Sequence, residues 1–382
     1  MKIGIDASNL LQGGGRTHLR ELLGAARPEE HGIQQVIVWG SASTLEELPK
    51  CSWLLKQHIP ILEQGALRRI FWQQFQLGKL ARDSKVDILF APGGSVGNAF
   101  HPYVTMCRNM LPWEWSELRR YRGSWIIYRL LLLRLIQARS FRKADGVIFL
   151  TDYARNIVQQ AIKIPKEQAI TTIPHGINPH FFREPRSIQN SKGTTEPLRL
   201  IYVSIIDFYK HQWRVIDAVS RLRQIGYSLT LDLIGPANEK ALALLFAAIE
   251  SLDPERAWVR YHGAVPSSEL YSFYQQADIG IFASSCENLP NILLETMAAG
   301  LPIACSNRGP MPEILGDAGV YFSPENPADI AISIQQLIDQ PEKRLHLATN
   351  SYARAKCFSW EDCAAATLTF LAKVAADFPK GQ

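Results

Sequence analysis

The chain contains 382 residues, of which 47% are hydrophobic and 20% are charged, and its net charge is +5. This is the composition of an ordinary soluble globular protein with ample apolar residues for a core, and it excludes an intrinsically disordered chain. Because domains usually contain about 100–200 residues, the length predicts two or three of them.

The cysteines and the first residues indicate a cytoplasmic protein. The six cysteines form no C-x-x-C pair and lie mostly in apolar runs, so we expect buried free thiols in a reducing compartment. The apolar start of the chain is interrupted at Asp6, too early for the core of a signal peptide.

Charge is divided unevenly along the chain. Residues 1–185 carry 24 Lys and Arg against 15 Asp and Glu, whereas the remainder carries 17 against 21. The basic first half indicates contact with an anionic partner or surface. We expect no nucleic-acid partner.

Short apolar segments alternate with helix-length segments through the first half. Strands that are separated by helical crossovers form parallel sheets with helices on both faces. We therefore predict a Rossmann-like domain over residues 1–182. Its predicted strands include 2–7, 35–40, 58–62, 86–91 and 103–107, and residues 67–82 are predicted as one amphipathic helix.

Residues 183–199 are polar, contain Pro and Gly, and have the composition of a linker. The alternation of strands and helices then restarts and predicts a second Rossmann-like domain over residues 200–358. A terminal helix is expected over 359–382, with Ser359 as its cap and acidic residues in its first turn.

The segment from Tyr121 to Lys143 is both apolar and rich in arginine. Its longest apolar run is far shorter than the ~20 residues that a membrane span needs. Two interpretations remain open: a helix in the interface of an anionic membrane, or a core helix whose arginines reach the solvent. Arg122 and Arg129 share a predicted face, whereas Arg134 and Arg139 rotate away from it.

Most of the candidate site residues follow predicted strands. In open parallel sheets, ligands bind outside the carboxyl ends of the strands, so residues in these positions are candidates for a site. Lys210 stands at a helix start, where a cation is unfavourable unless it pairs with an anion. The candidates of this type are Gly14, Gly15, Arg108, Asn109, Ser204, Lys210, His262 and Glu287.

Residues 284–306 (SSCENLPNILLETMAAGLPIACS) contain the most informative pattern. The pattern predicts a turn, a short helix, a stop at Gly300 and a second buried strand. Asn288 is expected to cap the helix, and Pro290 to lie in its first turn, where its missing N–H has no partner. Glu287 and Glu295 flank the helix start, whose free N–H groups favour a phosphate.

This stretch resembles the E-x7-E signature of the retaining GT-B glycosyltransferases of family 4, also called group 1. The resemblance rests on Glu287, Pro290, Glu295, Met297, Ala298, Gly300 and Pro302. It implies a GT-B fold, in which two Rossmann-like domains face each other across a cleft and the terminal helix crosses back to the first domain.

The resemblance also implies roles for individual residues. Glu287 would face the donor sugar, Glu295 would hold the ribose, and Lys210 would grip the diphosphate. Lys210, Glu287, Arg108 and Asn109 form the expected catalytic set. The expected donor-binding set is Gly14, Gly15, Ser204, Lys210, His262, Glu287, Asn288, Leu289, Pro290, Asn291 and Glu295.

The chain departs from the family pattern at two places. Ser204 stands where many members have an arginine, and Arg108-Asn109 stands where many have a histidine. The first departure removes one of the usual two cations near the diphosphate, and the second removes an imidazole near the transferred sugar.

We therefore expect a retaining hexosyltransferase that uses a GDP- or UDP-linked sugar, with mannose among the candidate hexoses, and a glycan or lipid-linked saccharide as acceptor. The resemblance implies that it needs neither a metal nor a cofactor, and that it works in the cytoplasm or at the inner face of the membrane. A sugar-nucleotide epimerase or hydrolase and a non-catalytic nucleotide-sugar-binding protein are the alternatives.

Overall fold

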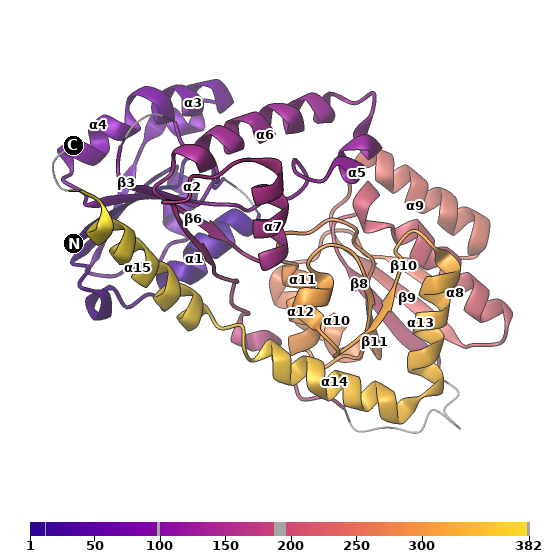
Figure 1. The fold of residues 1–382 in the computed structure, drawn as a ribbon. Helices are drawn as coiled ribbons and strands as arrows, with labels where there is room; N and C mark the ends of the chain where they lie inside the picture. Colours follow the sequence, from indigo (N-terminus) through magenta and orange to yellow (C-terminus); the bar gives the residue numbers. More distant parts are fainter. Residues whose placement is uncertain (12, 98–99, 187–195, 380–382) are drawn as a thin grey trace. The chain divides into compact units, whose positions relative to one another are not determined.

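The computed structural model describes residues 1–11, 13–97, 100–186 and 196–379. The chain forms two units (Figure 1). The first contains residues 1–176 together with the chain from Ser359 onward, and the second contains Ile177–Phe358. The boundary thus lies at Gly176 rather than at residue 182, and residues 187–195 of the predicted linker lie outside the described residues.

The first unit is built on a parallel sheet of seven strands in the order β3-β2-β1-β4-β5-β6-β7. Its strands are β1 (Lys2–Asp6), β2 (Gln35–Gly40), β3 (Leu54–His58), β4 (Ile88–Ala91), β5 (Tyr103–Met106), β6 (Gly146–Phe149) and β7 (Ala169–Thr172). Its helices are α1 (Gly14–Ala25), α2 (Ala42–Glu46), α3 (Ala66–Phe75), α4 (Leu77–Asp83), α5 (Trp115–Leu118), α6 (Trp125–Lys143), α7 (Asp152–Ala161) and α15 (Trp360–Asp377).

The second unit has a parallel sheet of six strands in the order β10-β9-β8-β11-β12-β13. Its strands are β8 (Leu198–Val203), β9 (Leu229–Ile234), β10 (Val259–Tyr261), β11 (Ile279–Phe282), β12 (Ile303–Ser306) and β13 (Val320–Phe322). Its helices are α8 (Gln212–Gln224), α9 (Glu239–Leu252), α10 (Ser267–Gln276), α11 (Asn291–Ala298), α12 (Met311–Leu315), α13 (Pro327–Asp339) and α14 (Pro341–Ala355).

The predicted fold class of two Rossmann-like domains is confirmed. Central strands such as β4, β6 and β11 are buried along their whole length, because helices cover both faces of each sheet. This explains why they appear in the sequence as continuous apolar runs rather than as an alternating pattern.

Three local predictions were wrong. Residues 58–62 are not a strand: β3 ends at His58, and Pro60 begins a 3-10 turn because proline cannot donate to a sheet. Residues 67–82 form two helices, α3 and α4, which meet at Gln76. Helix α11 begins at Asn291 after Pro290, without a side-chain cap, so Asn288 does not cap it.

The terminal helix α15 completes the first unit by packing on α1 and β4. Its predicted cap is present, since the Ser359 hydroxyl accepts a hydrogen bond of 2.9 Å from the Asp362 N–H. Among the described residues, none of the helices combines the length and the apolar character that a bilayer-spanning segment requires.

Gly235, at the end of β9, brings the chain close to the loop that follows β8. Its φ is +144°, and a Cβ atom there would lie 2.1 Å from the Ser204 carbonyl oxygen. Only glycine fits this backbone conformation and this contact.

We predict that Gly235→Ala lowers the free energy of unfolding by about 3 kcal/mol or more, because backbone has to move to relieve the clash. Gly24→Ala is the control: Gly24 lies inside α1 with no atom within 4 Å of an added Cβ, so this change should be neutral or stabilising by up to about 1 kcal/mol. Urea unfolding of both variants measures the difference. Equal stability would show that the β9–β8 contact is not tight.

Candidate active site

The order of the strands reverses once in each sheet, and Lys210 and Glu287 lie at the reversal point of the second sheet. In the second sheet, β8 is the first strand in the chain and lies between β9 and β11. The loops after β8 and β11 therefore diverge to opposite sides and leave a crevice at the carboxyl edge, where ligands of open α/β sheets bind. The loop after β8 carries Lys210, and the loop after β11 carries Glu287.

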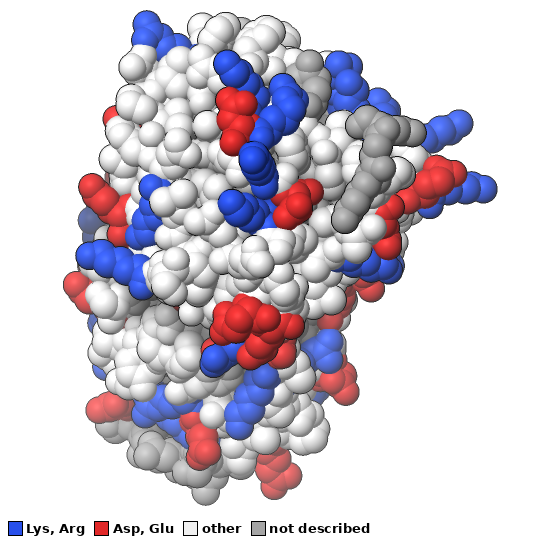
Figure 2. Space-filling view, turned by 90° about the vertical axis from the view of Figure 1, so that its left-hand side faces the viewer, with Lys and Arg blue, Asp and Glu red and all other residues white. Residues whose placement is uncertain are grey.

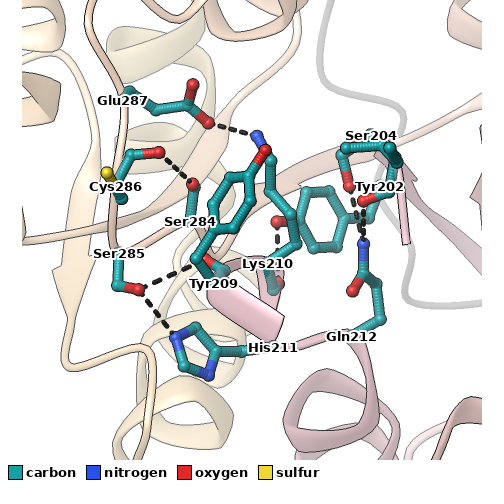
Figure 3. A network of polar contacts seen from close by, with 11 residues as sticks. Tyr202, Ser204, Tyr209, Lys210, His211, Gln212, Ser284, Ser285, Cys286 and Glu287 are labelled. Carbon is teal, nitrogen blue, oxygen red and sulfur yellow. Dashed lines mark hydrogen bonds and ion pairs between the residues drawn. The ribbon is translucent and has the colours of Figure 1, made fainter. Parts of the chain in front are cut away.

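Lys210 and Glu287 form a buried ion pair (Figure 3). Only 7% of the Lys210 side chain and 16% of the Glu287 side chain are exposed. The ammonium group also lies 5.1 Å from the centroid of the Tyr209 ring and 5.2 Å from that of Phe282. Opposite charge and two aromatic rings thus compensate for the hydration that Lys210 has lost.

The loop of Lys210 has an unusual backbone. Phe208–Lys210 form a single 3-10 turn, and Asp207 Oδ1 accepts a hydrogen bond of 2.7 Å from the Phe208 N–H. His211 follows with φ of +53°, in the left-handed region that residues with a side chain seldom adopt. The turn directs Lys210 toward Glu287 before α8 begins.

Hydrogen bonds between the two loops stabilise this conformation. The Ser285 N–H donates to the Tyr209 carbonyl at 2.8 Å, and the Ser285 hydroxyl lies 3.0 Å from His211 Nε2. The Tyr202 hydroxyl donates to the Lys210 carbonyl at 2.9 Å (Figure 3). A cation that is held on both sides in this way is preorganised for a ligand.

Ser204 supplies no charge to this crevice. Its side chain is buried, and its hydroxyl accepts a hydrogen bond of 2.8 Å from Gln212 Nε2, which also donates to the Ile205 carbonyl. Residue 204 is therefore part of the structural support of the loop rather than a cationic group.

Glu295 has surroundings different from those of Glu287. It lies in the second turn of α11 beside Tyr274 of α10, and its Oε2 atom is buried without a hydrogen bond. Burial raises the pKa of Glu295 to about 8, and the Tyr274 hydroxyl offsets part of this rise. The two carboxyl groups of the E-x7-E motif therefore have different surroundings: Glu287 pairs with Lys210, whereas Glu295 is buried beside Tyr274.

The other predicted donor-binding residues of the second unit lie in two places. Asn288 and Leu289 are buried between β11 and α11. Pro290 precedes α11 rather than lying in its first turn, and Asn291 is the first residue of the helix. His262 follows β10, where its Nε2 lies 2.6 Å from Asp232 Oδ1 and its ring contacts Phe273 edge to face.

In the first unit, Arg108 holds the start of α1. Helix α1 begins at Gly14, so Gly14 and Gly15 both lie in its first turn. The Arg108 guanidinium donates to the Gly14 carbonyl at 2.7 Å and to the Gly15 carbonyl at 3.3 Å. Burial lowers the pKa of Arg108 to about 10, so it stays protonated. Asn109 accepts a hydrogen bond of 3.0 Å from the Leu111 N–H.

His18 is not among the site residues predicted from the sequence. This buried residue of α1 lies with Nδ1 3.4 Å from Arg108 Nη1, and its ring stacks on His175 at 4.5 Å. Burial, and then the neighbouring His175 and Arg108, hold the pKa of His18 well below its usual value, so the imidazole is neutral. In the sequence, His18 could have been identified as a site residue by its position one helical turn after Gly14. The first unit thus places an imidazole beside Arg108, contributed by another element.

The second unit also contains a cavity of about 620 Å³ that none of the predicted site residues line. It lies at the amino ends of the strands, between the starts of β8 and α14, and Arg199, Asp278 and Arg344 contribute to its wall. Among the described residues, no cluster of three His, Cys, Asp or Glu side chains could hold a metal ion.

Comparison with known proteins relates both units to one group of enzymes. Residues 184–354 match the family described as glycosyl transferases group 1, and residues 12–181 match glycosyltransferase family 4. The O-antigen chain mannosyltransferase B of Escherichia coli is 35% identical over 111 residues, which cover 29% of this chain and 29% of that protein.

Solved structures with low identity share the fold. The sucrose-phosphate synthase of Thermosynechococcus elongatus superimposes with a TM-score of 0.77 at 15% identity, over 99% of this chain and 100% of that one. Anabaena Alr3699/HepE, in complex with UDP-glucose, gives a TM-score of 0.67 at 18% identity and covers 98% of each chain. These likenesses establish the GT-B fold of the chain.

The raised pKa of Glu295 predicts a pH-dependent stability. Between its ordinary pKa of 4.5 and about 8, the folded protein keeps a proton that the unfolded chain releases, so stability falls as the pH rises through this window. Glu295→Gln should remove this decrease, which over the whole window amounts to about 5 kcal/mol at ~1.4 kcal/mol per pKa unit. Urea unfolding at both ends of the window measures it, with Glu342→Gln, an exposed change on α14, as the control. An unchanged pH profile in Glu295→Gln would show that the carboxyl is not desolvated.

Proposed function

Because the chain belongs to the group 1 type of glycosyltransferases, we propose that it transfers a hexose from a nucleoside diphosphate sugar to a hydroxyl group of a glycan or lipid-linked saccharide. The observation that carries this proposal is the Lys210–Glu287 pair at the carboxyl edge of the second sheet. We expect the anomeric configuration to be retained.

The pair has the chemistry that a diphosphate donor requires. Lys210 is a buried cation on a loop that hydrogen bonds hold in place, and Glu287 is its anionic partner. A diphosphate that enters the crevice can replace Glu287 as the counter-ion of Lys210. Glu287 is then free to accept hydrogen bonds from the sugar hydroxyls, while the start of α11 presents N–H groups to the phosphates.

The reaction forms a glycosidic bond between the acceptor oxygen and C1 of the hexose, while the bond from C1 to the diphosphate oxygen breaks. The acceptor proton passes to the departing diphosphate, so no separate general base is needed. Lys210 stabilises the charge that develops on the leaving group, which is usually the largest catalytic contribution in such a site. This chemistry calls for neither a metal nor a cofactor.

Glu295 and Arg108 have supporting roles in this proposal. The Oε2 atom of Glu295 has no hydrogen-bond partner among the described residues, so it can accept a hydrogen bond from a ribose hydroxyl. Arg108 shapes the glycine-containing start of α1, and its hydrogen bonds to Gly14 and Gly15 make it a positioning residue. The free thiols, among them the exposed Cys357, support a reducing, cytoplasmic location.

A thermal-shift panel of GDP-, UDP- and ADP-sugars identifies the donor, because a ligand that binds only the folded state raises its melting temperature. Product analysis with the stabilising donor then separates the alternatives. A hydrolase or epimerase converts the donor without a saccharide acceptor, and a binding protein shows stabilisation without turnover. Either result would overturn the transferase proposal, and NMR of the new anomeric centre tests retention.

We predict that Lys210→Met reduces turnover by about 10²-fold or more, the scale of a lost charge-stabilising group. The exposed Lys240→Met on α9 should leave turnover unchanged. Because Lys210→Met leaves Glu287 unpaired, the double variant Lys210→Met/Glu287→Gln should recover stability but not activity. Normal turnover in a folded Lys210→Met variant would assign the diphosphate to another cation.

We predict that Glu295→Ala weakens the affinity for the nucleoside diphosphate by about tenfold, as expected for one lost hydrogen bond to a ribose hydroxyl. Calorimetric titration of the nucleoside diphosphate that the thermal-shift panel selects measures this change. The matched control is Glu342→Ala. An unchanged dissociation constant would exclude Glu295 from ribose binding without affecting the assignment of Lys210.

A further inference from the structure

Large apolar side chains are exposed together on one part of the first unit. Of the sixteen that are exposed among the described residues, nine belong to two helices, α3 and α6. Single exposed apolar residues are common, but a concentration of this kind marks an interaction surface. These residues are Leu67, Ile70, Phe71, Phe75, Trp125, Tyr128, Leu132, Leu135 and Ile136.

Helix α6 has one exposed stripe along its whole length. Its first part is apolar, with Trp125 75% exposed and Leu135 69% exposed. Its last part is basic. Arg139 and Arg142 lie two helical turns after Leu132 and Leu135, so they continue the same stripe, and Lys143 ends it. The opposite face, with Leu130 and Phe141 among its residues, is buried.

Helix α3 repeats this arrangement. Leu67, Phe71 and Phe75 are spaced along its exposed face, and Trp72 and Gln73 are buried beneath them. The loop at Ser95–Val96 joins the two helices, because Gln73 donates to the Ser95 carbonyl and the Val96 N–H donates to the Ser140 hydroxyl of α6. Figure 1 shows α3 and α6 next to each other, and their exposed residues define the α3–α6 surface.

The charge of this surface has a single sign. Helices α3 and α6 contain six arginines and one lysine but no Asp or Glu. Figure 2, which displays one face of the protein, shows basic and acidic side chains interspersed over it. Arg134 is the exception among the arginines of α6, because it packs over Trp113 and Trp115 and donates to the Pro112 carbonyl at 3.1 Å.

Exposed apolar side chains together with positive charge favour a lipid bilayer over a second copy of the chain as the partner of this surface. A second copy placed symmetrically on the surface would oppose arginine to arginine without any acidic partner on these helices. The interface of an anionic bilayer accepts both features, because aromatic and aliphatic side chains enter the region below the headgroups while arginines contact the phosphates.

We propose that the α3–α6 surface binds the interface of an anionic lipid bilayer, with both helices lying in the membrane plane. The structure thereby favours the interfacial interpretation of residues 121–143 and adds α3 to it. The binding does not depend on the proposed transferase reaction, since it needs neither donor nor acceptor. It would bring the enzyme to the surface where a lipid-linked acceptor resides.

The test is flotation of the full chain with vesicles of phosphatidylcholine, with or without about 30% phosphatidylglycerol. We expect binding only to the vesicles that contain phosphatidylglycerol, and a severalfold loss of binding between about 0.1 M and about 0.5 M NaCl, because salt screens surface charge. Equal binding to both kinds of vesicle, or binding to neither, would overturn the proposal.

A basic variant, Arg129→Gln/Arg139→Gln/Arg142→Gln, should weaken binding about tenfold or more. Its matched control replaces three arginines that are exposed outside this surface, Arg27→Gln/Arg214→Gln/Arg260→Gln, and should bind as the wild type does. If both triple variants lose binding equally, net charge rather than this surface attracts the vesicles.

An apolar variant, Trp125→Gln/Leu132→Gln/Leu135→Gln, should also weaken binding about tenfold, even at low salt. The control Ile225→Gln/Leu244→Gln/Ile332→Gln changes exposed apolar residues elsewhere. Melting curves establish that each variant is folded. Sedimentation of the wild type and of the apolar variant adds a second readout. If the wild type forms a dimer but does not bind vesicles, and the apolar variant is a monomer, the surface binds a second copy of the chain and not a membrane.

Discussion

Parallel strand pairing is the constraint on which the structure depends. Because every named strand pair in the described part of the chain is parallel, the loops at the carboxyl ends of the strands gather at one edge of each sheet. The reversal of strand order between β8 and β11 then separates two neighbouring loops. A lysine and a glutamate that are 77 residues apart in the chain can form a direct ion pair there.

The burial of this ion pair links stability to function. A lysine that has lost most of its hydration stays charged only while an anion or an aromatic face is near, and the structure supplies both. The same arrangement leaves Lys210 ready for a stronger anion than Glu287. In the first unit, by contrast, the cation Arg108 is already committed to the backbone of α1, which suits it to shape a loop rather than to hold a ligand.

In both units, residues of the same type have different surroundings because they are buried to different extents and against different partners. Glu287 faces a cation, whereas Glu295 faces Tyr274 and takes a raised pKa. Of the arginines of α6, Arg134 packs on two tryptophans, whereas Arg139 and Arg142 remain in solvent beside exposed apolar side chains. The residue type alone does not distinguish the members of either set, and only their packing shows the difference.

The sequence by itself determined the two Rossmann-like units, the terminal helix with its Ser359 cap, and the positions of Lys210 and Glu287 at strand ends, because apolar periodicity and local turn chemistry encode these features. It misplaced the cap of α11 and missed the break between α3 and α4, where local signals are weak. Only the tertiary structure decided that Lys210 pairs with Glu287, that His18 lies against Arg108, and that the apolar stripe of α6 faces outward beside α3. These are contacts between distant segments, and periodicity specifies which residues share a face but not what that face meets.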